Sequence, residues 1–182
     1  METLPTDPST RGLVFGLADS GKTTFSFEYA EAILKENPES VCLILAQKPK
    51  SKRKPIKLEF DETFDRMLFK WITDRASLLF TISQLHLHIE QPLELVIVED
   101  ILEVANTSQA QALIANLINA LSVFPGCRLL VTMTPKPDSN ISLFRHFFTH
   151  YVNTCGENRH FGRFYKCVHK AKYELETSLN IA

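Results

Sequence analysis

The amino-acid sequence predicts an α/β protein whose central sheet is mostly parallel and carries helices on both faces. Short apolar runs that suit buried strands alternate along the chain with longer segments of helical periodicity. Several of these runs are apolar throughout instead of alternating with polar residues, which indicates strands that are covered on both faces. In such folds ligands bind at the carboxyl ends of the strands, so the residues that follow each strand are the first candidates for function.

The elements follow one another in a regular order. Strands are expected at residues 13–16, 41–46, 67–72, 93–100 and 127–134, followed by a short helix and strand within 141–152 and by one or two edge strands within 163–176. Helices are expected from Lys22 to about Lys35, from a cap at Asp74 to about Ile89, and after a cap at Thr107 or Ser108. Side chains expected in the core include Trp71, Leu113, Ile114, Leu117, Ile118, Leu121, Phe144, Phe147, Phe148 and Tyr151.

The bulk composition indicates one globular domain. The chain has 182 residues, of which 45% are hydrophobic and 23% are charged. We assign residues 12–176 to the domain, 1–11 to a flexible N-terminus and 177–182 to a tail. The four cysteines show no CxxC spacing, which favours a reducing compartment. The sequence shows no signal peptide and no apolar run of about 18 residues, so we expect no membrane contact.

The first functional motif is a phosphate-binding loop, GLADSGKT, at residues 16–23. It satisfies the pattern GxxxxGK[ST], in which backbone N–H groups and a lysine contact phosphates and a hydroxyl contacts Mg²⁺. A strand precedes it and a helix follows, as such a loop requires. We therefore predict ATP and Mg²⁺ as cofactors. The expected nucleotide-binding residues are Gly16, Asp19, Ser20, Gly21, Lys22, Thr23 and Thr24.

The second motif is an acidic end to a buried strand, LVIVED, at residues 95–100. In P-loop proteins such an acid holds Mg²⁺ together with the loop hydroxyl, here Thr23. Spacing alone does not choose between Glu99 and Asp100. We prefer Asp100, because the shorter carboxylate is the usual one. Lys22, Glu99 and Asp100 are thus the candidate catalytic residues.

Part of the expected hydrolytic machinery is absent from the sequence. A carboxylate that orients the attacking water often follows the second strand, but that position reads AQKPKSKRK and the next acid is Glu59. The last strand before residue 135 offers only Thr132 or Thr134 where many ATPases sense the γ-phosphate with a polar side chain. The sequence therefore predicts nucleotide binding with weak turnover.

A basic run follows the second strand. Because the formal net charge of the chain is −1, this run is a strong local bias. It is interpreted equally well as a contact to DNA phosphates, as a nuclear import signal, or as a solvated loop. Its residues are Lys48, Lys50, Lys52, Arg53, Lys54 and Lys57.

Taken together, the phosphate loop, the strand LVIVED, the strand RLLVTMT and the segment LFRHFF resemble the core of RecA-type recombinase ATPases in order and spacing. The closest likeness is to the short, divergent paralogues that pair with a SWIM-domain zinc protein in the animal Shu complex. The resemblance covers residues 12–173 and implies a RecA-like fold, ATP binding, affinity for single-stranded DNA and a nuclear role. It also implies a heterodimer with the SWIM-domain protein and support of recombinase filaments in homologous recombination.

The chain also departs from that family. The water-orienting glutamate is not evident, no N-terminal helical domain is expected, and the segments after Asp100 and Thr134 are short for recombinase DNA-binding loops. Strand exchange by this chain alone is therefore not expected. Two alternatives stay open. One is a small metabolic P-loop kinase with Arg159 and Arg163 in a lid, and the other is an interaction module whose nucleotide is structural.

Overall fold

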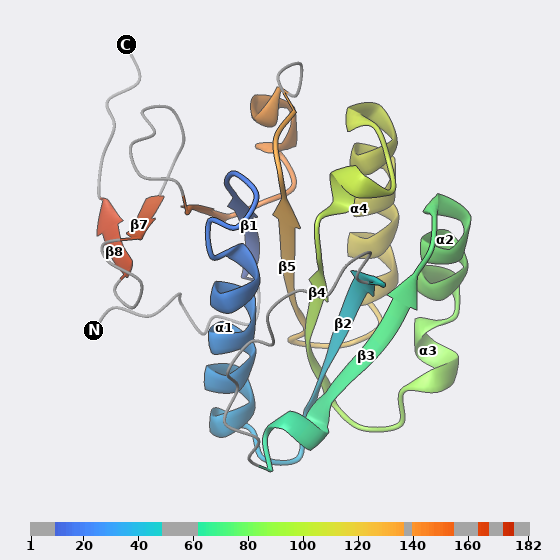
Figure 1. Ribbon diagram of the computed structural model, residues 1–182. Coiled ribbons are helices and arrows are strands. Elements are labelled where there is room, and N and C mark those ends of the chain that lie inside the picture. Colours follow the sequence, from blue (N-terminus) through green and yellow to red (C-terminus); the bar gives the residue numbers. More distant parts are fainter. Residues whose placement is uncertain (1–9, 49–61, 137–139, 155–163, 168–172, 177–182) are drawn as a thin grey trace.

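The computed structural model describes residues 10–48, 62–136, 140–154, 164–167 and 173–176. It contains an eight-stranded sheet in the order β3-β2-β4-β5-β1-β6-β7-β8 (Figure 1). All neighbouring pairs from β3 to β7 are parallel, and only β7 and β8 pair in antiparallel fashion. The strands are β1 (Arg11–Phe15), β2 (Val41–Gln47), β3 (Met67–Ile72), β4 (Leu93–Val98), β5 (Arg128–Met133), β6 (His150–Asn153), β7 (Phe164–Cys167) and β8 (Tyr173–Glu176).

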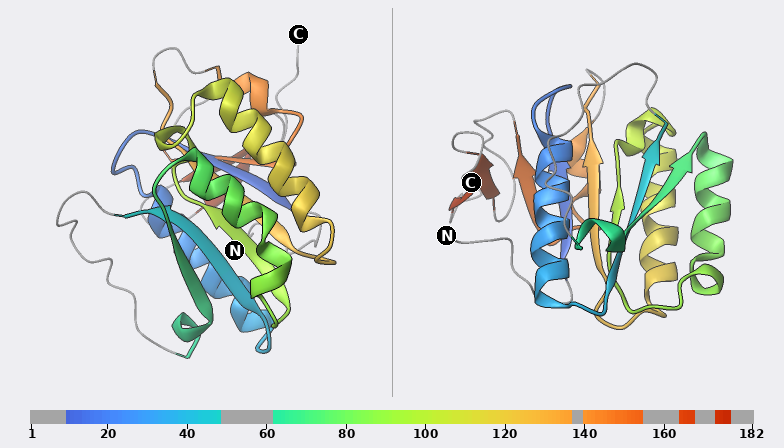
Figure 2. Two further views of the ribbon diagram at one scale, coloured as in Figure 1. Left: turned by 90° about the vertical axis from the view of Figure 1, so that its right-hand side faces the viewer. Right: turned by 60° about the horizontal axis from the view of Figure 1, so that its bottom comes forward.

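Helices cover both faces of this sheet, which confirms the predicted α/β class. One face carries α1 (Lys22–Glu36), and the other carries α2 (Arg75–Ser83), α3 (Leu85–His88) and α4 (Thr107–Leu121) (Figure 2). The buried side chains accordingly form two clusters. Along β4, Val96 and Val98 belong to the α4 cluster, while Leu95 and Ile97 belong to the α1 cluster. A strand buried on both faces has no polar positions to alternate, so the continuous apolar runs predicted the parallel sheet correctly.

The helices begin and end close to the expected positions, with two corrections. The segment after Asp74 is not one helix to Ile89, because α2 ends at Ser83 and the short α3 follows. The cap of α4 is neither Thr107 nor Ser108 but Asn106, whose Oδ1 accepts a hydrogen bond from Gln109 N at 3.0 Å. The Gln109 side chain in turn accepts one from Asn106 N at 3.2 Å, which closes a capping box.

The predicted aromatic core is confirmed except at one residue. Phe144, Phe148 and Tyr151 are buried, and Phe147 packs against them in part. Trp71, expected in the core, instead has 49% of its surface exposed. It lies on β3, the edge strand of the sheet, and no described helix covers the sheet there.

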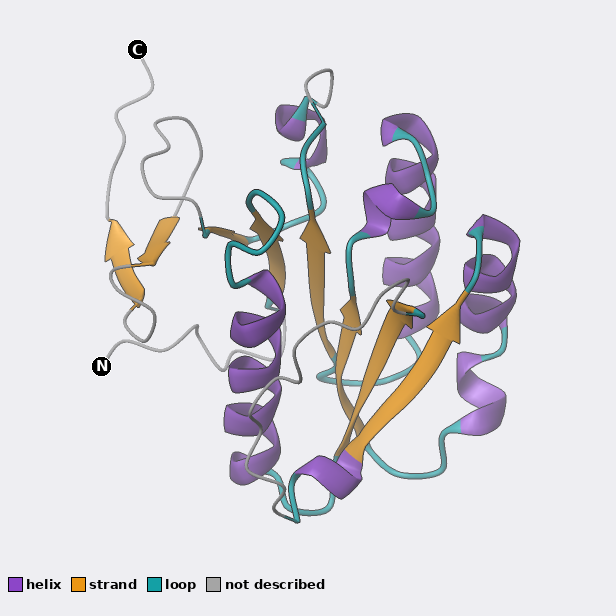
Figure 3. Cartoon of the chain, in the orientation of Figure 1, coloured by secondary structure: helices purple, strands orange, loops and turns teal. Residues whose placement is uncertain are grey.

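Because β1 to β6 run in the same direction, their carboxyl ends meet at one edge of the sheet, the upper edge in Figure 3. Two short 3₁₀ helices lie beyond this edge, η2 (Ile101–Glu103) after β4 and η3 (Ile141–Phe144) after β5, whereas a third, η1 (Phe64–Arg66), precedes β3. The loops that follow β1, β4 and β5 are therefore neighbours, although they lie far apart in the sequence. The expected N-terminal segment, apart from Thr10 and Arg11, and the C-terminal tail lie outside the described residues.

Candidate functional site

The phosphate loop (residues 16–23) connects β1 to α1 at the carboxyl edge of the sheet. Gly21, which precedes α1, has φ of 92°, a left-handed conformation that favours glycine. Asp19 also has a positive φ, 59°, which aspartate tolerates better than most residues. Two neighbours fix the loop: Gly16 N donates to Met133 O of β5 at 3.3 Å, and the Ser20 hydroxyl bonds to the hydroxyl of Thr154 beyond β6.

The amino end of α1 opens onto this loop without a side-chain cap. The first hydrogen bond of the helix runs from Phe25 N to Gly21 O at 2.9 Å. The N–H groups of Lys22, Thr23 and Thr24 come before it in the chain and therefore have no carbonyl partner within the helix. N–H groups at such an end, added to the positive end of the helix dipole, form a favourable place for an anion.

The Lys22 side chain folds over the loop. Its Nζ donates to Gly16 O at 3.0 Å and to Leu17 O at 2.7 Å, and the residue is only 7% exposed. Within the described part of the chain, its ammonium group makes no ion pair. A buried cation satisfied only by carbonyl groups is costly unless an anion joins it. The loop therefore has the electrostatic character of an anion site.

Thr23 connects the loop to the acidic end of β4. Its Oγ1 donates to Glu99 Oε2 at 2.9 Å. The second oxygen, Glu99 Oε1, is buried and accepts no hydrogen bond in the described structure, since the nearby Ser26 hydroxyl donates to Lys22 O at 3.1 Å. Burial raises the pKa of Glu99, and the hydroxyls of Thr23 and Ser26 and the charge of Lys22 offset this only in part. The Thr23 hydroxyl and the Glu99 Oε1 oxygen, which has no hydrogen-bond donor, are the kinds of oxygen group that bind a hydrated Mg²⁺ ion.

Asp100 has a different role. It adopts a left-handed conformation with φ of 50°, and its two carboxylate oxygens accept hydrogen bonds from Thr134 N and Thr134 Oγ1, both at 2.7 Å. Its own N–H donates to Thr132 Oγ1 at 2.8 Å. Asp100 thus fastens the end of β4 to the end of β5. The geometry favours Glu99 over Asp100 as the acid for Mg²⁺, the reverse of the order expected from sequence.

The same contacts involve both threonines that the sequence offered as γ-phosphate sensors. Thr132 is fully buried and Thr134 is bonded to Asp100. Sequence reasoning also missed Thr154, because no motif marks a residue that contacts the phosphate loop from a strand 134 positions away. The described residues contain no group of three or more His, Cys, Asp or Glu side chains able to hold a metal by themselves. An Mg²⁺ ion here would depend on phosphate oxygens for part of its coordination.

The remaining sequence candidates lie elsewhere. Lys48 directly follows β2 and is exposed. The other basic candidates (Lys50, Lys52, Arg53, Lys54 and Lys57) and the two arginines of the possible kinase lid (Arg159 and Arg163) fall outside the described residues.

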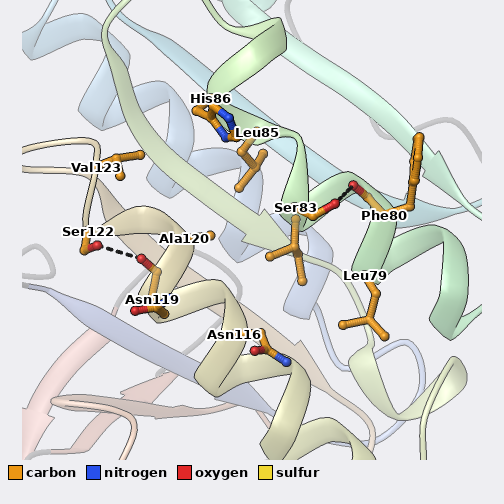
Figure 4. Close-up of a pocket in the computed structure, with 11 residues that line it drawn as sticks. Leu79, Phe80, Ser83, Leu85, His86, Asn116, Asn119, Ala120, Ser122 and Val123 are labelled. Atoms are coloured by element: carbon orange, nitrogen blue, oxygen red, sulfur yellow. Dashed lines mark hydrogen bonds between the residues drawn. The ribbon is translucent and has the colours of Figure 1, made fainter.

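A separate pocket of about 640 Å³ lies between α2, α3 and α4, on the sheet face opposite α1 (Figure 4). Its walls include Leu79, Leu85 and Val123. Two hydroxyls at its edge are bonded within their own helical turns, Ser83 to Phe80 O and Ser122 to Asn119 O, both near 2.8 Å. The pocket holds none of the phosphate-loop residues.

Comparisons with known proteins add no family: no protein-family model matches the chain, and no curated protein matches it significantly. Among the described helices, none is long and apolar enough to cross a bilayer.

Proposed function

We propose that this protein binds ATP with Mg²⁺ at the phosphate loop and acts as an accessory subunit of a recombination complex. The observation that carries the first part is the buried Lys22 ammonium group, which donates to loop carbonyls and has no ion pair among the described residues. Phosphate oxygens would supply the missing charge, because hydrogen bonds between ionised partners are about twice as strong as neutral ones.

Each residue of the site has a defined part in holding the nucleotide. The uncapped N–H groups of Lys22, Thr23 and Thr24 bind phosphate oxygens, and Lys22 turns from the carbonyls of Gly16 and Leu17 to the outer phosphates. Thr23 and Glu99 hold the hydrated metal. When bound, Mg²⁺ supplies positive charge that neutralises the phosphates.

We infer that hydrolysis is slow. The segment after β2 offers no carboxylate to orient a water molecule before Glu59. Asp100, Thr132 and Thr134 bond to one another instead of facing the loop as free groups. In this proposal Glu99, together with Thr23, holds the metal and does not orient water. The described residues at the site therefore favour holding the nucleotide over cleaving it.

The order of strands is consistent with a P-loop fold. β5 lies between β1, which precedes the phosphate loop, and β4, which ends in the acid. The proposal retains the recombinase-paralogue resemblance noted from the sequence.

The cellular part of the proposal depends on that resemblance and on the basic run. We propose that the chain binds single-stranded DNA, pairs with a SWIM-domain zinc protein as a heterodimer, and supports recombinase filaments during homologous recombination in the nucleus. The basic residues from Lys48 to Lys57 are the candidates for DNA contact. Nucleotide binding would then stabilise the subunit and its assembly.

A thermal-shift experiment tests nucleotide binding. Binding to the folded state stabilises it by about 2.7 kcal/mol at a ligand concentration of one hundred times Kd. For a chain of this length that corresponds to a rise in melting temperature of about 5–10 °C with Mg·ATP. EDTA should reduce the shift by removing Mg²⁺. No shift with any nucleoside triphosphate would contradict the proposal.

A further inference from the structure

The α1 face of β3 presents an aromatic row that the nucleotide site does not use. It starts at the buried Phe27 of α1, whose ring centroid lies 5.9 Å from that of Phe69. Phe69 also contacts Phe64 at 5.8 Å and Trp71 at 6.4 Å. The row becomes more exposed toward the carboxyl edge of the sheet, since Phe69 is 38% and Trp71 49% exposed. We call Phe69 and Trp71 the β3 aromatic face.

The position of β3 explains this exposure. It is the edge strand, and α1 packs against β4, β5 and β2. On this side Phe69 is contacted by Phe27 of α1 and by Phe64 of η1, which lies at the amino end of β3 (Figure 2). Strand residues two positions apart point to the same side, so Phe69 and Trp71 stand side by side while Lys70 points to the other face. Two neighbouring aromatic side chains on one exposed strand are the usual sign of a binding surface.

Positive charge lies beside this face. Trp71 pairs with Ala46 of β2, and Lys48 follows two residues later. Lys48 is exposed, and five further basic residues follow it in the sequence up to Lys57. The exposed acids that precede β3, Glu62 and Asp65, lie near its amino end instead. At the carboxyl end, the exposed Asp74 caps α2 and is followed by the exposed Arg75, so these two charges cancel and Lys48 leaves a net positive charge.

We propose that Phe69 and Trp71 form a stacking platform for the bases of single-stranded nucleic acid, with Lys48 contacting its phosphates. This inference rests on the DNA-binding part of the proposed function and assigns it a surface. Exposed aromatic rings beside basic residues are the combination by which proteins bind single strands without sequence preference. The groove between α2, α3 and α4 also exposes apolar side chains, among them Phe80 and Val123, but no lysine or arginine is among the residues that line it.

The chain offers a direct probe, because Trp71 is its only tryptophan. Titration of the full-length protein with a single-stranded oligothymidylate should quench the tryptophan fluorescence. The quenching should follow the same binding curve as the anisotropy of a labelled strand. The matching duplex should quench less, because its bases are already stacked and paired.

Variants then test the energetic role. Trp71→Ala should weaken single-strand binding by about 5-fold to 150-fold, whereas Trp71→Phe should retain most of the affinity because it keeps a stacking ring. Phe80→Ala is the matched control, since it removes an exposed ring from the opposite face of the sheet and should change nothing. Mg·ATP binding should be unchanged in all three variants, because β3 and β1 are four strand spacings apart, about 19 Å.

The outcomes separate this inference from the proposed function. If the wild type binds the strand without quenching, and Trp71→Ala binds equally well, the platform is wrong while DNA binding stands. If the wild type binds Mg·ATP but no single strand, the DNA part of the proposed function fails and this inference fails with it. Shielding of Trp71 from acrylamide in the free protein would show that the chain itself covers the face. Self-association that is lost in Trp71→Ala would assign the face to a second copy. Either result would overturn the platform.

Discussion

The Lys22 ammonium group lies close enough to Glu99 to lower the pKa of its carboxyl, yet both groups keep unused hydrogen-bonding capacity in the described structure. The Lys22 ammonium group bonds only to carbonyl groups, and Glu99 Oε1 accepts no hydrogen bond. Buried polar groups in native proteins are rarely left in this state unless a ligand completes them. At the scale of single residues, a phosphate with its hydrated Mg²⁺ would complete both.

Substitution of the two acids separates their roles. Glu99→Gln should weaken the Mg²⁺-dependent part of ATP binding by about 10-fold to 100-fold, the usual cost of losing a group that orients a metal's shell. Asp100→Asn should leave most of that dependence intact. It should instead lower the free energy of unfolding by about 1–3 kcal/mol, because the amide keeps only one acceptor oxygen and no charge for the two hydrogen bonds from Thr134. Calorimetry across Mg²⁺ concentrations and urea unfolding provide the two measurements. The opposite order of effects would return the metal role to Asp100.

The sequence predicted these residues as candidates, but it did not predict which acid lies beside Thr23 and which links β4 to β5. The motif spacing indicates that Lys22 and Thr23 lie near the acids, since strand ends meet at one edge. The choice of Asp100 over Glu99 depended on frequency alone. The left-handed conformation of Asp100 and its contact with Thr134 reverse this choice. That contact is possible only because β5 lies beside β4. That adjacency is a tertiary fact with no local signal.

At the scale of elements, the side chains that cap the N-termini of helices contribute measurably to the stability of the protein. Asn106→Ala should destabilise the protein by about 1 kcal/mol, because it removes the acceptor for Gln109 N in the capping box of α4. For a chain of this length the melting temperature should fall by about 2–4 °C. Thr107→Ala is the matched control, because the sequence offered Thr107 or Ser108 as the cap but the structure places both inside the helix. An equal loss in both variants would contradict the observed cap.

The cap of α2 predicts a pH dependence. The hydrogen bond from Ser77 N to Asp74 holds the pKa of that carboxyl below its ordinary value of 3.8. A lowered pKa in the folded state means that the charged form stabilises the helix above pH 3.8, and that this contribution is lost as the pH falls through the folded value. Asp74→Asn keeps a capping side chain without a titrating group. Urea midpoints below pH 4 should therefore fall less steeply in Asp74→Asn, and parallel curves would contradict the prediction.

Elements were predictable where the core imposes a strong pattern. The strands β2, β4 and β5 are continuous apolar runs, and the inward positions of α4 follow helical spacing. Trp71 was misplaced because a tryptophan in an apolar run is ordinarily buried, and the sequence does not say that β3 is an edge strand. The break between α2 and α3 was missed because apolar spacing continues across it.

At the scale of the whole molecule, the order of strands could not be read from the sequence. Local pattern predicts that strands exist, but the insertion of β5 between β1 and β4 arises from long-range packing. A recombinase paralogue and a metabolic kinase differ in the charge of the surface that they require.

Salt dependence distinguishes these functions. If the basic run contacts phosphates, combined Lys52→Ala, Arg53→Ala and Lys54→Ala substitutions should make the plot of log affinity for single-stranded DNA against log salt less steep by about 2, at roughly 0.7 per lost contact. Lys35→Ala, on α1 and outside this run in the sequence, is the control. An unchanged slope would remove the run from the DNA surface. A kinase would show no salt-steep DNA binding at all.

The central claim, that the phosphate loop binds ATP through Lys22, is tested most directly by calorimetric titration of Mg·ATP into the wild type and Lys22→Ala. The wild type should bind with a stoichiometry of one. Lys22→Ala should lose about 100-fold or more in affinity, because the phosphates lose their charged partner, while its thermal unfolding shows that it remains folded. Lys35→Ala, an exposed change on the same helix, should bind as the wild type does. Wild-type affinity in Lys22→Ala would contradict the account.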